Sequence, residues 1–156
     1  ILNNLKFVEF PKLGLGELKK MINKISKLEG GLLLIDYGYL VPKNKNTLQS
    51  LLKHKRNNLL ENLGKADITS LVNFNLLNEY FIKNSLKVKK IVTQKFFLEK
   101  MGIVERANSL SQKMSFKEQS NLYLRLKRLL DKKLMGNLFK VIFAYKSKKD
   151  NFLGFE

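Results

Sequence analysis

The sequence predicts an α/β fold, a sheet flanked by helices, and three observations point to it. Residues 14–28 show helical periodicity, and Gly30-Gly31 follows them. The next residues, 32–36, form a short run that is apolar without interruption. Such a run, entered from a helix, is typical of a buried parallel strand. Helix-like and strand-like segments then continue to alternate, as they do in a sheet covered by helices.

The first predicted helix covers residues 14–28 and is amphipathic. Its apolar positions recur at helical spacing: Leu15, Leu18, Met21, Ile22, Ile25 and Leu28. Glycine commonly ends helices, so Gly30-Gly31 is expected to stop this one before the strand begins.

The later elements are predicted by the same reasoning. They are a helix over 47–62, a polar turn over 64–69, a helix over 74–84, a strand over 86–93, a helix from 96 interrupted at Gly102, a helix from 115 to about 132, and a strand over 138–145. Ser115 and Glu118 have the spacing of a capping box, which favours a helix start there. The residues after Lys146 are charged and are expected to be loose.

Composition limits the function classes. The chain has 156 residues, 30 Lys and Arg against 13 Asp and Glu, a net charge of +17 and no Cys. Without Cys there is no disulfide scaffold, thiolate nucleophile or Cys-based zinc site. No apolar run reaches the roughly 18 to 20 residues that a membrane span needs. Because most of the basic residues are Lys, a solvated basic surface is favoured over a dedicated nucleic-acid site.

Asp36 is the first candidate site residue, because it closes the predicted strand. Open α/β sheets bind ligands outside the carboxyl ends of their strands, so Asp36, Tyr37 and Tyr39 are candidate pocket-wall residues. The alternative is that Asp36 caps the following loop. His54 is the only His, so it cannot form a multi-His metal site, and a local hydrogen-bonding role is favoured. For Asp67 and Thr69 as well, local hydrogen bonds in a turn or a cap are the favoured role.

Several motifs follow one another in an ordered series. They are Gly30-Gly31-Leu32-Leu33-Leu34-Ile35-Asp36-Tyr37-Gly38-Tyr39, Thr47-Leu48-Gln49 with His54, Gly64-Lys65-Ala66-Asp67-Ile68-Thr69, Val72-Asn73-Phe74, Thr93-Gln94, Phe97-Leu98, Met101-Gly102-Ile103 with Arg106, and Met135-Gly136-Asn137-Leu138-Phe139-Lys140-Val141. Over residues 8 to 145 this order resembles the C-terminal half of the MidA-like family of S-adenosylmethionine-dependent methyltransferases. That family includes the mitochondrial arginine methyltransferase needed for respiratory complex I assembly.

The resemblance implies a fold, a cofactor and partners. It implies part of a class I methyltransferase (Rossmann-like) sheet with inserted helices, with 1–146 as the C-terminal part of the domain and 147–156 as a charged tail. S-adenosylmethionine would be bound mainly by a half upstream of Ile1, with no cofactor-binding residue in this chain, and the 156 residues alone are expected to be inactive. The expected partner is a protein substrate such as a complex I subunit. Neither nucleic acid nor a metal is expected.

The resemblance also implies residue roles. Asp36 would orient a substrate guanidinium, and the substrate side would include Tyr37, Gly38, Tyr39, His54, Asp67 and Thr69. The chain departs from the family's usual pattern at Leu71 and Asn73, where relatives often have His and Asp. Bacterial cytoplasm is the expected location, and mitochondrial matrix is the alternative. Two other functions stay open, a noncatalytic assembly protein and a basic RNA-binding protein.

Overall fold

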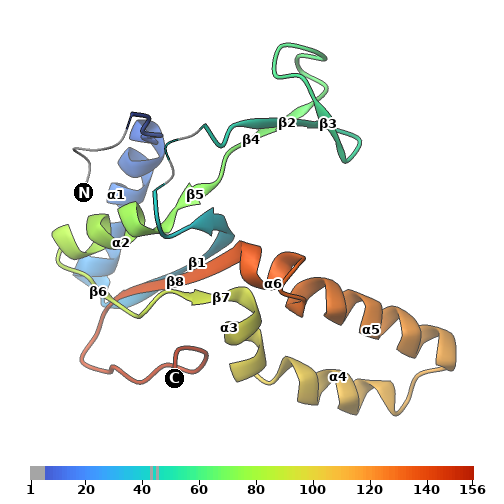
Figure 1. Cartoon of the computed structure of the whole chain (residues 1–156). Coiled ribbons are helices and arrows are strands. Elements are labelled where there is room, and N and C mark those ends of the chain that lie inside the picture. Colours follow the sequence, from blue (N-terminus) through green and yellow to red (C-terminus); the bar gives the residue numbers. More distant parts are fainter. Residues whose placement is uncertain (1–5, 43, 45) are drawn as a thin grey trace.

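The centre of the molecule is a mixed five-stranded sheet. In the computed structural model, which describes residues 6–42, 44 and 46–156, the strands lie in the order β5-β1-β8-β6, with β7 also pairing with β8. Their bounds are β1 (Gly30–Tyr39), β5 (Val72–Asn73), β6 (Lys87–Val88), β7 (Val92–Thr93) and β8 (Phe139–Lys146). The predicted α/β fold is therefore confirmed, and β1 and β8 form the long middle pair (Figure 1).

β1 was predicted as a strand buried on both faces among parallel neighbours, and that part of the prediction is wrong. It runs antiparallel to β8 along residues 30–37 and pairs in parallel with β5 only at Gly38 and Tyr39. On its second edge, residues 30–37 pair with no other described strand. Leu33 and Ile35 are 42% and 43% exposed, so the face that carries them is only partly covered.

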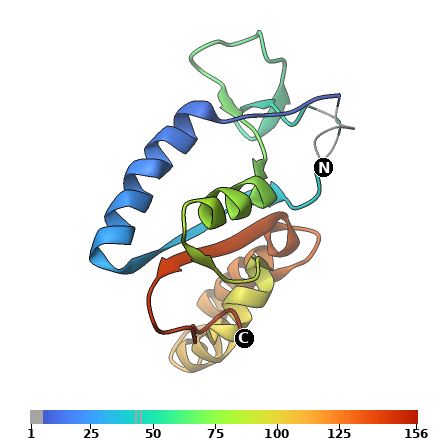
Figure 2. The same ribbon diagram turned by 90° about the vertical axis from the view of Figure 1, so that its left-hand side faces the viewer.

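One face of the sheet is covered by α1 (Lys12–Leu28) and α2 (Phe74–Lys83), as Figure 2 shows. The core between them is made of Leu15, Leu18, Ile22, Phe74, Phe81, Leu86, Ile142 and Ala144. The predicted first helix is confirmed, and Leu15, Leu18, Ile22 and Ile25 of its predicted stripe pack in the core. Met21 and Leu28 of the same stripe are 51% and 79% exposed. The helix ends at Leu28, and the following left-handed residue is Glu29, with φ of 53°, rather than a glycine.

Four helices follow on the other side of β8. They are α3 (Gln94–Lys100), α4 (Ile103–Ser111), α5 (Phe116–Leu130) and α6 (Met135–Leu138). The predicted interruption is confirmed, since left-handed Gly102 separates α3 from α4. The predicted capping box of Ser115 and Glu118 is also present at the start of α5. Helices α4 and α5 form a hairpin that extends away from the sheet (Figure 1).

The helix predicted over 47–62 is wrong. These residues begin a three-stranded arm that consists of β2 (Gln49–Leu52), β3 (Lys55–Asn57) and β4 (Asp67–Thr69), in the order β3-β2-β4. Lys53 and His54 connect β2 to β3 with φ values of 49° and 64°, the sign that a type I′ hairpin turn requires at both central residues. Pairing between strands has overridden the helical spacing of the leucines.

Two smaller predictions, for residues 86–93 and for the residues after Lys146, also change. The strand predicted over 86–93 is split into β6 and β7, both of which pair with β8. The residues after Lys146 are not loose, because the rings of Phe152 and Phe155 lie 4.8 and 5.9 Å from the ring of Phe143. Packing of Phe152 and Phe155 against Phe143 holds this segment on the sheet, although the segment carries several charged residues.

Candidate functional site

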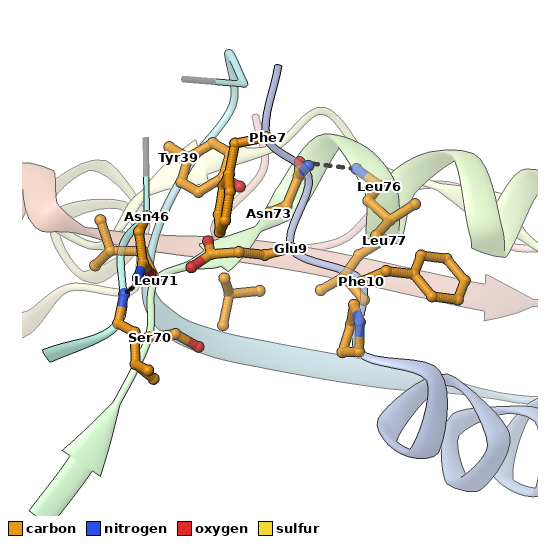
Figure 3. Close-up of a pocket in the computed structure, with 13 residues that line it drawn as sticks. Phe7, Glu9, Phe10, Tyr39, Asn46, Ser70, Leu71, Asn73, Leu76 and Leu77 are labelled. Carbon is orange, nitrogen blue, oxygen red and sulfur yellow. Dashed lines mark hydrogen bonds between the residues drawn. The ribbon is translucent and has the colours of Figure 1, made fainter. Parts of the chain in front are cut away.

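A pocket of about 430 Å³ lies where β1 and β5 end and α2 begins. Since these two strands are parallel, both present their carboxyl ends to it, which is where open α/β sheets bind ligands. Its wall is made of Phe7, Glu9, Phe10, Pro11, Tyr39, Asn46, Leu48, Ser70, Leu71, Val72, Asn73, Leu76 and Leu77. Figure 3 shows Glu9 in the middle of this wall, between polar Asn46 and Ser70 and apolar Phe10 and Leu77.

Glu9 is held by a chain of hydrogen bonds that joins three segments. The backbone N–H of Thr47 donates to Glu9 Oε1 at 2.9 Å, and the Thr47 hydroxyl donates to Oε2 at 2.7 Å. The same hydroxyl oxygen accepts from the backbone N–H of Leu71 at 2.9 Å. The segment before α1, the loop before β2 and the segment before β5 are thereby fixed around one carboxylate.

Tyr39, the last residue of β1, faces this carboxylate. Burial raises the pKa of the Tyr39 hydroxyl, and the negative charge of Glu9 raises it further. Tyr39 was predicted from the sequence to line a pocket, and it does so. The phenol therefore stays protonated at neutral pH and keeps an O–H donor at the pocket.

Asn73 is one of the two positions where the resemblance to the MidA-like family led us to expect another residue, here Asp. Its Oδ1 accepts a hydrogen bond from the backbone N–H of Leu76 at 3.1 Å and so caps α2. Either Asn or Asp can cap a helix in this way, so the change preserves the cap while it removes a charge from the pocket wall.

Asp36 does not line this pocket. Its Oδ1 accepts from the backbone N–H of Tyr37 at 2.7 Å, and the strand register places it opposite Lys140 of β8. Burial lowers the pKa of Lys140, whose Nζ donates to the backbone carbonyls of Asn137 and Leu138. The hydrogen bond from the Tyr37 N–H to Asp36 is local, like the capping role that the sequence offered as the alternative to a pocket-wall role.

Two further residues of the predicted set have structural contacts. The ring of Tyr37 meets the ring of Phe139 edge-on at 5.6 Å. Gly38 is buried where β1 meets β5, and a Cβ there would lie 2.2 Å from the Val72 carbonyl oxygen and 2.7 Å from the Phe74 ring. Only glycine lets β1, β5 and α2 approach this closely beside the pocket, whose wall includes the neighbouring Tyr39 and Val72.

The other three predicted residues lie on the arm. His54 is exposed in the β2–β3 turn, and Asp67 and Thr69 belong to β4. The arm joins the pocket through the segment from Ser70 to Asn73, which directly follows Thr69. The Thr69 hydroxyl oxygen is buried and has no hydrogen-bond partner among the described residues.

Glu9 was missed by the sequence analysis. It stands between Val8 and Phe10, ahead of the first predicted helix, with no motif around it. Its importance depends on Thr47 and Leu71, which lie 38 and more residues away, so no local signal could have found it.

Neither a metal nor a cofactor has a complete site in the described residues. No cluster of three or more His, Asp or Glu able to hold a metal occurs among them. None of the nine glycines forms a glycine-rich loop between a strand and the helix after it: Gly14 and Gly16 lie inside α1, and Gly30 and Gly31 begin β1. The residues present therefore do not by themselves form a cradle for S-adenosylmethionine. No described helix is long and apolar enough to cross a membrane.

Known proteins are similar to this chain in sequence. The model of a family described as putative S-adenosyl-L-methionine-dependent methyltransferase matches residues 6–92, more than half of the chain. The mitochondrial protein arginine methyltransferase NDUFAF7 of Xenopus tropicalis is 32% identical over 124 residues, which cover 79% of this chain and 28% of that protein. Its Caenorhabditis elegans homolog is 30% identical over 95 residues, 61% of this chain and 22% of that protein. The chain thus spans less than a third of these relatives.

Solved structures share the fold. Two crystal structures from Burkholderia thailandensis match 98% of this chain. One is of an uncharacterised protein, with a TM-score of 0.80, 20% identity and 43% of that chain covered. The other is described as a likely methyl transferase bound to S-adenosyl-homocysteine, with a TM-score of 0.76, 21% identity and 42% covered.

Proposed function

Because the chain belongs to the family of putative S-adenosyl-L-methionine-dependent methyltransferases, we propose that it forms the substrate side of a protein arginine methyltransferase. The observation that carries the proposal is the pocket at the carboxyl ends of β1 and β5, in a chain similar to two proteins named as arginine methyltransferases. In an α/β sheet of this kind, that edge is where substrate and cofactor meet.

S-adenosylmethionine is the proposed methyl donor, and it is proposed to be bound mainly by a part of the protein outside this chain. The family description supports the donor, and the absence of a glycine-rich strand-to-helix loop from the described residues supports the location. The described residues would then shape and orient the protein substrate, while the cofactor is held elsewhere.

The substrate is proposed to be a protein, such as a subunit of respiratory complex I. The names of the relatives from Xenopus tropicalis and Caenorhabditis elegans support an arginine-containing protein and a mitochondrial location. The Burkholderia thailandensis structures come from a bacterium, so the bacterial cytoplasm and the mitochondrial matrix are both retained as proposed locations.

Among the residues predicted from the sequence, Tyr39 is the one that we keep at the pocket. Tyr37, Gly38, His54, Asp67 and Thr69 are proposed to support the wall or the arm rather than to touch the reacting group. Asp36 remains a candidate for substrate orientation, although its bond to the Tyr37 N–H favours a local role.

The proposal is tested on the full-length protein. It should be incubated with S-adenosylmethionine carrying an isotope-labelled methyl group and with a membrane-free extract from cells that lack it. Mass spectrometry is expected to find labelled methylarginine and no labelled methyllysine. Label on lysine alone, or no label although S-adenosylmethionine binds, would contradict the proposal. Failure to bind S-adenosylmethionine at all would favour the noncatalytic assembly protein.

A further inference from the structure

We propose that Glu9 is the residue that anchors the substrate guanidinium, with its carboxylate at the centre of the pocket and aromatic rings on the walls. The inference rests on the proposed function and deepens it, because it assigns the recognition of arginine to one side chain. Neither the sequence motifs nor the resemblance pointed to Glu9.

The negative charge of Glu9 suits a cationic substrate group. Among the described residues that line the pocket, Glu9 carries the only formal charge, and it is negative in a chain whose net charge is +17. The ion pairs formed by described residues are Lys20 with Glu17, Lys89 with Asp150 and Lys95 with Glu99, and none of them includes Glu9. A half-buried carboxylate that pairs with no basic residue among 6–42, 44 and 46–156 is suited to a cationic ligand.

The Glu9 carboxylate also has hydrogen-bond acceptor positions that Thr47 does not use. A carboxylate offers about four lone-pair sites, two on each oxygen. Thr47 uses one site on Oε1 with its N–H and one on Oε2 with its hydroxyl. One site is left on each oxygen, and a planar guanidinium can bind both at once through two parallel N–H donors.

Hydrogen bonds hold the Glu9 carboxylate in a fixed orientation. The Leu71 N–H donates to the Thr47 hydroxyl oxygen, so that the hydroxyl hydrogen is directed to Glu9. Two donors on the carboxylate and one on the hydroxyl fix its orientation before a ligand arrives. A preorganised anchor loses less entropy on binding than a free surface carboxylate does.

The size and the aromatic lining of the cavity suit an arginine side chain. About 430 Å³ is within the usual range for small-ligand pockets and exceeds the volume of an arginine side chain. Phe7 and Tyr39 stand close to Glu9 in Figure 3, and Phe10 lies farther along the wall. Aromatic faces accept both the methylene groups of arginine and its flat cationic end.

Binding of a small arginine analogue tests the anchor directly. N-acetyl-L-arginine amide and N-acetyl-L-lysine amide are titrated into the ¹⁵N-labelled full-length protein and followed by NMR chemical shifts. The arginine amide is expected to bind more tightly than the lysine amide, and Glu9→Gln to weaken arginine binding about tenfold or more. Equal affinity for the two amides, or an unchanged affinity in folded Glu9→Gln, overturns the proposal.

Glu17→Gln is the matched control. Glu17 lies exposed on α1 and pairs only with Lys20 among described residues, so its loss removes the same charge without touching the pocket. Its arginine affinity is expected to match the wild type. An equal loss in Glu17→Gln would mean that net charge, rather than the pocket, binds arginine, and would overturn the proposal.

Ser70→Leu is a second variant that does not depend on the Glu9 hydrogen bonds. Ser70 is exposed and lines the pocket, so a larger side chain there narrows the cavity. It is expected to weaken arginine binding while the melting temperature stays close to the wild type. If Glu9→Gln does not fold and Ser70→Leu folds but binds arginine normally, the proposal is overturned.

Enzyme kinetics separate this proposal from the proposed function. If arginine binding depends on Glu9 but no methylarginine is ever formed, the anchor stands and the methyltransferase function fails. If methylarginine is formed and Glu9→Gln leaves both KM and kcat unchanged, the function stands and the anchor fails.

Discussion

At the scale of one residue, Gly38 shows how the close approach of β1, β5 and α2 depends on the absence of a side chain. The Val72 carbonyl oxygen and the Phe74 ring occupy the space that a Cβ would need. Gly30, at the other end of the same strand, has nothing within 4 Å of its Cβ position. The same substitution at the two ends of β1 therefore separates steric cost from a general effect of losing glycine.

We expect Gly38→Ala to lower the free energy of unfolding by about 1–3 kcal/mol, the usual cost of forcing extra volume into a packed site. Gly30→Ala is expected to change it by less than about 0.5 kcal/mol. Urea unfolding followed by circular dichroism measures both values. Equal losses at the two positions would show that the close approach of β5 and α2 to Gly38 is not the cause.

The candidate site was only partly predictable from single residues. Tyr39 lies at the pocket, where a residue at the end of a recognisable strand was expected, and its contact with substrate stays a prediction. Asp36 has the same sequence signal, yet its side chain bonds to its neighbour's backbone instead of lining the pocket. Glu9 has no sequence signal, since its place is set by long-range bonds to Thr47.

At the scale of the element, α5 depends strongly on its N-terminus. None of its residues is buried, so tertiary packing supports it less than it supports α1. The capping box must therefore supply much of its stability: the Ser115 N–H and hydroxyl both donate to Glu118, and these bonds lower the pKa of the Glu118 carboxyl.

Ser115→Ala is expected to cost about 1 kcal/mol of helix stability, because it removes the hydroxyl of the cap. Ser120→Ala, at an exposed position inside the same helix, is expected to cost nothing, since alanine is the better helix former. Amide hydrogen exchange of α5 measures the two effects separately from global unfolding. Faster exchange in both variants would argue against the cap as the cause.

The elements that could be predicted are those whose apolar periodicity is matched by packing, such as α1 and α2. The arm could not be predicted, because leucines spaced as in a helix are instead used in the paired strands β2 and β4. A turn formed by Lys53 and His54, without Gly or Asn, also hides the hairpin from sequence analysis.

At the scale of the whole molecule, one carboxylate adds to the aromatic contacts that hold the last residues on the sheet. Asp150 accepts a hydrogen bond from the Tyr145 hydroxyl and pairs with Lys89 Nζ at 3.0 Å. The Tyr145 hydrogen bond, followed by Lys89, lowers the pKa of Asp150 below its ordinary 3.8. Burial and the bond to Asp150 raise the pKa of Tyr145 to about 12.

Because the folded pKa of Asp150 is depressed, its contribution is complete above the ordinary value of 3.8 and is lost as the pH falls through the folded value. We expect the contact between Phe152 and Phe143 to weaken as the pH falls below about 3.8, and to be weaker already at pH 7 in Asp150→Asn. NMR signals of these rings measure the change. Ring signals in Asp150→Asn that match the wild type at pH 7 would refute the role of Asp150.

The open edge of β1 has a consequence for how copies of this chain behave together. Residues 30–37 offer backbone donors and acceptors on that edge, beside the partly exposed Leu33 and Ile35, which is a template for pairing with another strand. Mutual repulsion from a net charge of +17 opposes such contacts, and salt screens that repulsion over about 10 Å at 0.1 M and about 3 Å at 1 M. The 156-residue chain should therefore self-associate more readily as salt rises, which sedimentation velocity can follow, and Ile35→Lys should suppress the effect. A monomer at every salt concentration would mean that the edge is protected by something other than charge.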